Sequence, residues 1–347
     1  MTAVHQVLAG VGPYDAVSEQ ARVWRRLLRD AGYGGRDHAA QIDPRARSDF
    51  SPLAGLSPAA GDLLIMRYSA WSPPLTPLLD LPQRKLLVYH NITPAEYLWN
   101  HSPALAVQCA VGRIQLPAFA RAANVAVADS DFNAAELREA GAERTRVVPI
   151  LIDDGRYAAR APTPDGAGPL VLSVGRLVPN KRHDLVIAVF AAFQRERAPD
   201  ARLLVVGEAF TPAYGELMAR LVRESGARGV TLTGPVPQER VNAAYAAGDV
   251  LLHLSEHEGF CIPLLEAFHF GVPVVARPAG AMPGVGGEAV LWTDADPAVT
   301  SELLHLAVGD AELRSEMVRR GRERLEAFAY ERTAAAVREA VEAALGA

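Results

Sequence analysis

Strand-like apolar runs alternate with helix-like segments along this chain, and that alternation is the feature that most constrains its fold. A chain with this pattern forms parallel sheets with helices packed on both faces, the α/β class. In the first half we expect strands at Val4–Leu8, Asp62–Arg67, Lys85–Tyr89, Asn124–Ala128 and Arg146–Ile150. In the second half we expect them at Leu170–Val174, Arg202–Val206, Val230–Thr233, Val250–Leu254, Pro273–Ala276 and Ala289–Trp292. The two sets predict two doubly wound parallel-sheet domains.

A long aperiodic stretch separates the two sets of strands. It runs from Asp153 to Pro169 and is rich in proline, glycine and alanine, a composition typical of linkers. We therefore predict an N-terminal domain over residues 1–155, a linker over 156–169 and a C-terminal domain over 170–327. Ligands of doubly wound domains bind outside the carboxyl ends of the strands, so we expect a ligand in a cleft between the two domains.

The composition excludes several classes of protein. No run of about 18 apolar residues occurs in the 347 residues, so we expect no transmembrane helix. No secretory signal is visible at the N-terminus, and two cysteines cannot build a disulfide framework or a zinc quartet. The net charge of −5 does not indicate a nucleic-acid binder. We expect a cytoplasmic protein.

Two carboxylates stand eight residues apart in the stretch Glu258-Gly-Phe-Cys-Ile-Pro-Leu-Leu-Glu266. A strand-like run precedes the stretch, and an early proline and Gly271 bound a helix over Pro263–Phe270. The first backbone N–H groups of such a helix face the end of the sheet, where they bind anions. Carboxylates repel phosphate but accept hydrogen bonds from hydroxyls. The stretch therefore predicts a ligand with central phosphates and hydroxyls at both ends, a nucleotide sugar.

Arg176 and Lys181 follow the first strand of the second domain, in the loop before a helix. Lysine is rare here, because only Lys85 and Lys181 among the 35 basic residues are not arginines. Two cations beside a helix N-terminus would neutralise a diphosphate and stabilise it further as it leaves. The alternative is a pair of solvated loop charges.

The first domain contains further candidates. Gly10 and Gly12 follow its first strand, where glycine lets a ligand approach the backbone closely. A turn that merely needs glycine is the alternative. His90 follows the strand that ends at Tyr89, so it could hydrogen-bond a sugar or phosphate, or transfer a proton. A structural histidine agrees with the sequence equally well.

Arginines line one face of the first expected helix, which runs from about Val17 to Ala31; they are Arg22, Arg25, Arg26 and Arg29. The opposite face is apolar, so the packing of an ordinary amphipathic helix explains the pattern. The sharper interpretation is a basic surface for anionic lipid, or for an acceptor that carries phosphate. On that interpretation the protein makes peripheral contact with the inner face of a membrane.

Taken together, these segments resemble the family 4 glycosyltransferases, whose two Rossmann-like domains form the GT-B fold. The resemblance covers most of the chain and is carried by the glycine loop, His90-Asn91, Val174-Gly-Arg to Lys181, Thr233-Gly-Pro-Val236 and, most specifically, Glu258 to Glu266. It implies that Glu258 contacts the transferred sugar and that Glu266 binds the ribose hydroxyls. It also implies that Arg176 and Lys181 bind the diphosphate.

The same resemblance assigns the remaining residues. The donor-binding set it implies is Gly10, Gly12, Gly234, Val236, Gly259, Phe260, Cys261, Leu264, Leu265 and Glu266. The N-terminal domain would bind the acceptor, the C-terminal domain the donor, and a final helix over residues 328–347 would return to the N-terminal domain. Cys261 replaces the glycine that is usual in the family, which could alter the choice of donor.

The expected function is that of a metal-independent, retaining glycosyltransferase with a nucleoside-diphosphate sugar as co-substrate and no cofactor. Arg176, Lys181, Glu258 and His90 form its expected catalytic set. The acceptor would be a sugar, a lipid-linked molecule or another small molecule. Its hydroxyl would attack the sugar from the same face as the one from which the diphosphate leaves. Two alternatives stay open: a nucleotide-sugar epimerase of the same fold, and a non-catalytic sugar-nucleotide-binding protein. The sequence leaves the donor, the acceptor and the oligomeric state undefined.

Overall fold

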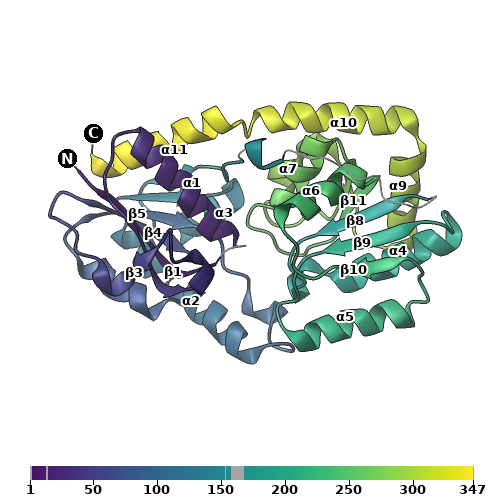
Figure 1. Ribbon diagram of the computed structural model, residues 1–347, viewed down its shortest axis with the longest axis horizontal. Helices are drawn as coiled ribbons and strands as arrows, with labels where there is room; N and C mark the ends of the chain where they lie inside the picture. The colour runs from purple at the N-terminus through teal and green to yellow at the C-terminus, as the bar shows by residue number, and fades with distance from the viewer. Residues whose placement is uncertain (1, 13–14, 153, 158–167, 347) are drawn as a thin grey trace. The chain divides into compact units, whose positions relative to one another are not determined.

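The computed structural model describes residues 2–12, 15–152, 154–157 and 168–346. The chain divides into two compact units. One contains Met1–Ile152 and Phe328–Ala347, and the other contains Asp153–Ala327. Each unit has its own parallel sheet with helices packed against it (Figure 1).

The first unit is built on a sheet of seven described strands in the order β3-β2-β1-β4-β5-β6-β7, and every pair is parallel. The strands are β1 (Val4–Val11), β2 (Asp37–Ile42), β3 (Ser51–Pro52), β4 (Leu63–Tyr68), β5 (Arg84–Tyr89), β6 (Val125–Ala128) and β7 (Thr145–Val147). The α-helices are α1 (Ala16–Asp30), α2 (Pro103–Ala122), α3 (Asp131–Glu139) and α11 (Tyr330–Leu345). Short 3-10 helices are η1 (Pro44–Ala46), η2 (Leu53–Gly55), η3 (Pro73–Asp80) and η4 (Ala95–Tyr97).

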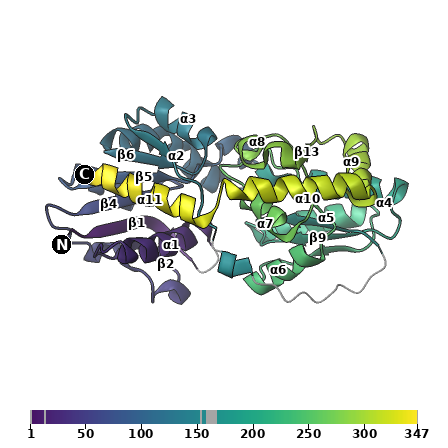
Figure 2. The same cartoon turned by 90° about the horizontal axis from the view of Figure 1, so that it is seen from above.

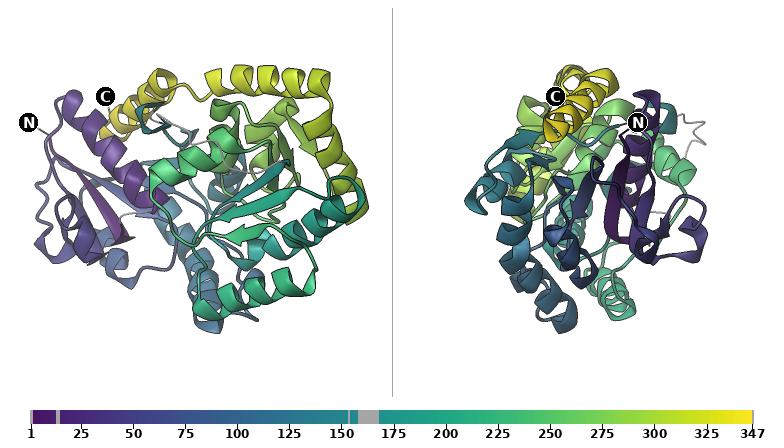
Figure 3. Two further views of the ribbon diagram at one scale, coloured as in Figure 1. Left: turned by 45° about the vertical axis from the view of Figure 1, so that its right-hand side comes forward. Right: turned by 90° about the vertical axis from the view of Figure 1, so that its left-hand side faces the viewer.

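Helices α1 and α11 cover the central strands of the first sheet. Val4, Ile65 and Val88 of the strands are buried with Trp24 of α1 and Val341 of α11 in one core. Helix α11 contacts α1, β5 and β6, and it lies beside α1 in every view (Figure 2; Figure 3). The C-terminal helix is therefore part of the core of the first unit, because its alanine and valine face is buried there.

The second unit has a sheet of six described strands in the order β10-β9-β8-β11-β12-β13. The strands are β8 (Leu170–Val174), β9 (Arg202–Val206), β10 (Val230–Leu232), β11 (Val250–His253), β12 (Val274–Ala276) and β13 (Val290–Trp292). The α-helices are α4 (His183–Glu196), α5 (Pro212–Glu224), α6 (Gln238–Ala247), α7 (Ile262–Phe270), α8 (Met282–Gly286), α9 (Pro297–Gly309) and α10 (Ala311–Glu326). The 3-10 helices are η5 (Asp154–Tyr157), η6 (Pro179–Lys181) and η7 (Gly287–Ala289). Its core joins Phe190 of α4 and Leu304 of α9 to Val205 and Leu252 of the strands.

The predicted α/β class is confirmed, since both sheets are parallel and alternate with helices. Strand β2 was not predicted because Asp-His-Ala-Ala-Gln-Ile is not an apolar run. The last strand of the first unit is shorter than the predicted Arg146–Ile150, and it ends at Val147, before Pro149, which has no N–H to donate to a ladder. The predicted linker over 156–169 falls largely outside the described residues.

Candidate functional site

The candidate residues of the second unit lie in loops that follow two paired strands. β8 ends at Val174, and the loop after it carries Arg176 and Lys181. β11 ends at His253, and the loop after it carries Glu258. Since β8 and β11 are paired in parallel, both loops lie at the same edge of the sheet, where doubly wound folds bind their ligands.

One oxygen of Glu258 accepts hydrogen bonds from three side chains. The Lys181 ammonium and the Ser255 hydroxyl each donate to its Oε1 over 2.7 Å. His253 Nε2 lies 2.9 Å from the same oxygen and must carry a proton, because a carboxylate only accepts. No described residue bonds the other oxygen, Oε2, of Glu258. The carboxylate is thus held by one oxygen and keeps the other for a ligand.

The groups around Glu258 also determine the charge of Glu258 and of Lys181. Burial opposes ionisation of Glu258, but Lys181 and His253 outweigh it and hold the pKa of Glu258 well below its usual range. Burial likewise disfavours the ammonium of Lys181, yet the Glu258 carboxylate raises the pKa of Lys181 above its usual value. Both groups are therefore ionised at neutral pH, and Glu258 has no proton to give.

The loop after β8 is shaped around the Lys181 side chain. Gly175 has a φ of +140°, and a Cβ placed there would lie 3.3 Å from Lys181 Nζ. Asn180 ties this loop to the other one, because its Nδ2 donates to His257 O over 3.0 Å. Arg176 is exposed and makes no ion pair with a described residue. Its guanidinium remains available to an anionic ligand.

Helix α7 begins directly after Cys261, which has left-handed backbone angles (φ 81°, ψ 68°) and is buried. Burial, followed by the charge of Glu258, raises the pKa of the Cys261 thiol well above its usual value, so the thiol stays protonated. Phe260, Leu264 and Leu265 are also buried. The side chains of Leu264 and Leu265 are fully buried, so any donor contact by these two residues would run through the backbone at the start of α7.

Glu266 lies one turn into α7 and is held by two tyrosines. Tyr245 OH donates to Glu266 Oε2 over 2.9 Å, and Tyr157 OH lies 3.5 Å from Oε1. Burial, followed by the charge of Glu266, raises the pKa of Tyr245 well above its usual value, so this phenol remains a donor. The two hydroxyls orient the carboxylate that the resemblance assigns to the ribose.

The predicted base-binding segment lies on the loop after β10. Gly234 has a φ of +68°, and Thr233 Oγ1 donates to Gly234 O over 2.8 Å. Val236 lines an apolar groove of about 680 Å³ along β9, β10 and α6. That groove contains neither Glu258 nor Glu266, so it is a different feature from the charged residues at the end of the sheet.

His253, Glu258 and Cys261 could together hold a metal ion. One ligand atom from each lies within 4.8 Å of the others, and a nitrogen, an oxygen and a sulfur ligand suit zinc. However, the ammonium of Lys181 already lies 2.7 Å from Glu258 Oε1. Lys181 thus supplies the positive charge that a metal ion would otherwise bring to this carboxylate.

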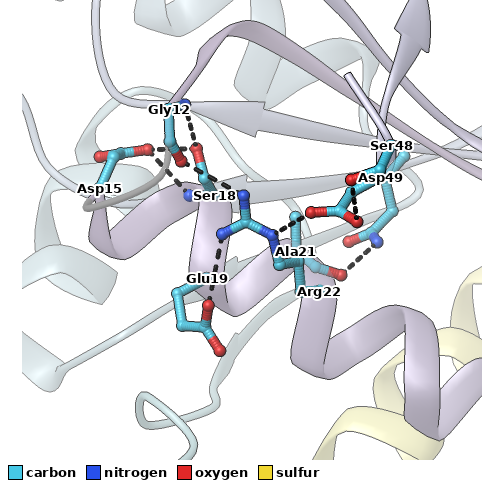
Figure 4. Close-up of polar contacts among 9 residues, drawn as sticks. Gly12, Asp15, Ser18, Glu19, Ala21, Arg22, Ser48 and Asp49 are labelled. Carbon is cyan, nitrogen blue, oxygen red and sulfur yellow. Dashed lines mark hydrogen bonds and ion pairs between the residues drawn. The ribbon is translucent and has the colours of Figure 1, made fainter. Parts of the chain in front are cut away.

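In the first unit, β1 extends to Val11, so Gly10 lies within the strand and not after it as predicted, whereas Gly12 follows the strand and is bonded to the start of α1 (Figure 4). Gly12 N donates to Ser18 Oγ over 3.1 Å, and Asp15 caps the helix by accepting from Ser18 N. A Cβ on Gly10 would make only ordinary contacts, and one on Gly12 would meet nothing within 4 Å. Both residues line a pocket of about 270 Å³ that also contains Arg67. Packing of the chain itself therefore does not demand glycine at either position.

His90 is held between Arg67 and Asp129. Arg67 Nη1 lies 3.0 Å from His90 Nε2, and Asp129 Oδ2 lies 2.9 Å from Nδ1. Arginine can only donate, so Nε2 accepts, and Nδ1–H donates to Asp129. Burial lowers the pKa of Arg67 to about 10, which still leaves it charged at neutral pH. Both ring nitrogens of His90 are therefore engaged by neighbouring side chains of the first unit.

The predicted basic face of α1 includes Arg25 wrongly, because Arg25 is buried, and the Arg22 of that face is already paired. Arg25 is 5% exposed and lies 2.6 Å from Asp37 Oδ1, because its charge compensates that buried carboxylate. Arg22 pairs with Asp49 over 2.8 Å and donates to Gly12 O (Figure 4). Arg26 and Arg29 are exposed. A surface of all four arginines does not exist.

A family model matches most of the second unit. Residues 158–324 match the family model of the glycosyl transferases, group 1. The predicted resemblance to the family 4 glycosyltransferases is confirmed, and these matches support the predicted enzyme class, a glycosyltransferase.

Curated proteins similar to this chain match it over part of their length. It is 36% identical over 140 residues to the GDP-mannose-dependent alpha-mannosyltransferase of Mycolicibacterium smegmatis, covering 40% of this chain and 33% of that one. It is 33% identical over 187 residues to the GDP-mannose-dependent alpha-(1-6)-phosphatidylinositol monomannoside mannosyltransferase of the same species, covering 47% and 46%. The chain thus spans about a third to a half of the length of these relatives.

Comparison with solved structures shows that the fold of the chain is GT-B. HepE of Anabaena, solved in complex with UDP and glucose, has a TM-score of 0.78 at 15% identity, covering 99% of this chain and 100% of that one. Sucrose-phosphate synthase of Thermosynechococcus elongatus has a TM-score of 0.76 at 19% identity, covering 96% and 97%. In the part of the chain that is described, no helix combines the length and hydropathy of a membrane span.

The structure adds residues that the sequence reasoning missed. His253, Ser255 and Tyr245 hold the two glutamates, and Arg67 and Asp129 hold His90. Two of these had a detectable signal, because His253 and Arg67 are polar residues inside otherwise apolar strands. A buried polar side chain needs a hydrogen-bond partner, and the partners of His253 and Arg67 are residues of the candidate sites, Glu258 and His90.

Proposed function

We propose that this glycosyltransferase moves a sugar from a nucleoside-diphosphate sugar to a hydroxyl acceptor, with retention of configuration and without a metal ion. The observation that carries the proposal is the state of Glu258, which is ionised, is held through Oε1 by three donors, and has no hydrogen bond to Oε2 from any described residue. Such an oxygen accepts hydrogen bonds from sugar hydroxyls. Glu266, oriented by Tyr245, does the same for the ribose.

The leaving diphosphate is stabilised by cations and by the start of a helix. Arg176 has no ionic partner among the described residues, and the charged Lys181 lies in the same loop. Charge that develops on the departing phosphate is stabilised by such fixed groups, and the N-terminus of α7 adds its partial positive charge. The acceptor oxygen attacks the anomeric carbon as the bond to the phosphate oxygen breaks. The acceptor proton passes to an oxygen of the leaving phosphate.

The properties of the relatives support a first choice of donor. Both M. smegmatis relatives are GDP-mannose-dependent, whereas HepE was solved with UDP and glucose. We therefore propose GDP-mannose as the donor to test first. The first unit would bind the acceptor. Cys109 and Cys261 are free thiols, which fits a reducing compartment and supports a cytoplasmic location.

A donor-consumption assay tests the function. GDP-mannose, UDP-glucose and other nucleotide sugars are first screened by thermal shift, since a ligand at a hundredfold excess over its Kd stabilises by about 2.7 kcal/mol. The stabilising donor is then incubated with and without candidate acceptors, in the presence of EDTA. Consumption that requires an acceptor and survives EDTA, with an axial anomeric product by NMR from an axial donor, supports the proposal. Conversion of the donor alone indicates an epimerase, and binding without conversion indicates a non-catalytic protein.

A further inference from the structure

A polar pocket of about 220 Å³ lies in the first unit and shares no lining residue with the glycine loop pocket. It is formed by the end of α1, the start of β2 and the segment that follows η1. Four arginines line it: Arg25, Arg29, Arg36 and Arg47. Two carboxylates, Asp37 and Asp49, also line it.

Both carboxylates are already neutralised by arginines of α1. Asp37 Oδ1 lies 2.6 Å from Arg25 Nη2, in a buried pair. Asp49 Oδ2 lies 2.8 Å from Arg22 Nε, and this arginine lowers the pKa of Asp49, which is therefore ionised and paired at neutral pH. Neither carboxylate is left to compensate another cation in the pocket.

The other three arginines have no counter-charge in the described chain. Arg29, Arg36 and Arg47 are exposed, and none of them makes an ion pair with a described residue. Three guanidinium groups around one small pocket repel one another, and an anion in the pocket would relieve that repulsion. Ser48 and Ser51 add hydroxyls to the same lining. Planar guanidinium groups bind phosphate oxygens in pairs, which makes arginine the preferred residue for phosphate recognition.

We propose that Arg29, Arg36 and Arg47 form a binding site for a phosphate group. A phosphate monoester or diester fits the pocket by size and charge, whether it belongs to a soluble molecule or to a lipid headgroup. The site replaces the basic face expected from the sequence, because Arg29 is the only member of that face that lines the pocket without a carboxylate partner among the described residues. It is separate from the diphosphate site proposed at Arg176 and Lys181, which belongs to the second unit.

The site shares a carboxylate with the anchoring of the glycine loop. Asp49 lines the pocket and accepts from Arg22, whose Nη2 donates to Gly12 O over 3.3 Å (Figure 4). A phosphate in the pocket would therefore lie next to the residues that fasten the loop. The proposal rests on the charges of the first unit and does not depend on the donor or on the transfer reaction.

Two titrations on the purified full chain separate the possible sources of the phosphate. Inorganic phosphate is titrated by calorimetry, and vesicles of phosphatidylcholine with or without phosphatidylglycerol are tested by co-sedimentation. The variants are Arg36→Gln, Arg47→Gln and the double variant. Arg138→Gln is the matched control, because Arg138 is exposed in the same unit but lies outside the pocket. Arg176→Gln reports any phosphate bound in the second unit.

We expect each pocket variant to weaken binding roughly tenfold, since one charge-assisted hydrogen bond is worth about 1.5–3 kcal/mol. Arg138→Gln keeps this binding, whereas a loss of phosphate binding in Arg176→Gln, with none in the pocket variants, would assign the phosphate to the second unit and overturn the proposal. If the pocket variants weaken the binding of free phosphate, the ligand is a soluble phosphate compound. If they weaken only the binding of vesicles with phosphatidylglycerol, the ligand is a lipid headgroup. The proposal is overturned if wild type binds neither probe, or if the double variant binds both as wild type does.

Discussion

Lys181 Nζ lies 2.7 Å from Glu258 Oε1, and this contact joins the loops after β8 and β11. It pairs the cation proposed for the diphosphate with the carboxylate proposed for the sugar. Both groups are therefore charged before any ligand binds, since each shifts the pKa of the other toward its ionised form. Glu258 is consequently a hydrogen-bond acceptor, and it is not a general acid.

The first prediction concerns stability and pH. The folded-state pKa of Glu258 is depressed, so its ionisation stabilises the fold above the unfolded-state pKa of about 4.3 and ceases to do so as pH falls through the folded-state pKa. Glu258→Gln should therefore be destabilised by about 3 kcal/mol at pH 7, because the charge of Lys181 is left uncompensated. That deficit should shrink below pH 4. Urea unfolding from pH 3 to pH 7 measures it, and a constant deficit would contradict the pKa assignment.

The second prediction concerns the backbone at Cys261. Its φ of 81° is left-handed, which costs a residue with a Cβ about 1 kcal/mol relative to glycine. Cys261→Gly and Cys261→Ala both remove the buried thiol, but only glycine relieves the backbone. The glycine variant should thus be more stable than the alanine variant by about 1 kcal/mol. Equal unfolding midpoints would show that the left-handed conformation is not retained in the variants.

The third prediction compares two glycines of the first unit. A Cβ on Gly12 meets nothing within 4 Å, whereas one on Gly35 would lie 2.1 Å from Val4 O. Gly12→Ala should fold with an unchanged melting temperature and lose turnover or raise a substrate KM, because the added methyl group occupies ligand space. Gly35→Ala should be destabilised by several kcal/mol. Wild-type kinetics in Gly12→Ala would remove the glycine loop from the site.

The fourth prediction concerns the carboxylate that we assign to the ribose. Tyr245→Phe removes the hydroxyl that lies 2.9 Å from Glu266 Oε2 and leaves the ring stacked on Phe270. We expect the donor KM to rise roughly tenfold, with a smaller change in kcat, because one hydrogen bond that orients a charged group is lost. Tyr214→Phe, a buried tyrosine on α5, is the control. A change in kcat alone would argue against a ribose role for Glu266.

Much of the fold could be predicted, because apolar runs such as Leu170–Val174 leave little alternative to a buried strand. Strand β2 could not be predicted, because its buried Asp37 depends on partners that are distant in the sequence, Arg25 twelve residues away and Gln6. The glutamates and cations of the site were named from a motif. The groups that hold Glu258 beside Lys181 are Ser255 and His253, and only the folded chain brings them to one carboxylate oxygen.

The turnover of Lys181→Ala, measured with a demonstrated donor and acceptor, tests the central claim most directly. The substitution removes the positive charge proposed to stabilise the leaving diphosphate, and it also removes the hydrogen-bond donor to Glu258 Oε1. We therefore expect kcat to fall at least about a hundredfold. Lys85→Ala, the other lysine, lies outside the proposed site and is the control. Wild-type turnover in Lys181→Ala would contradict the role proposed for Lys181 in sugar transfer.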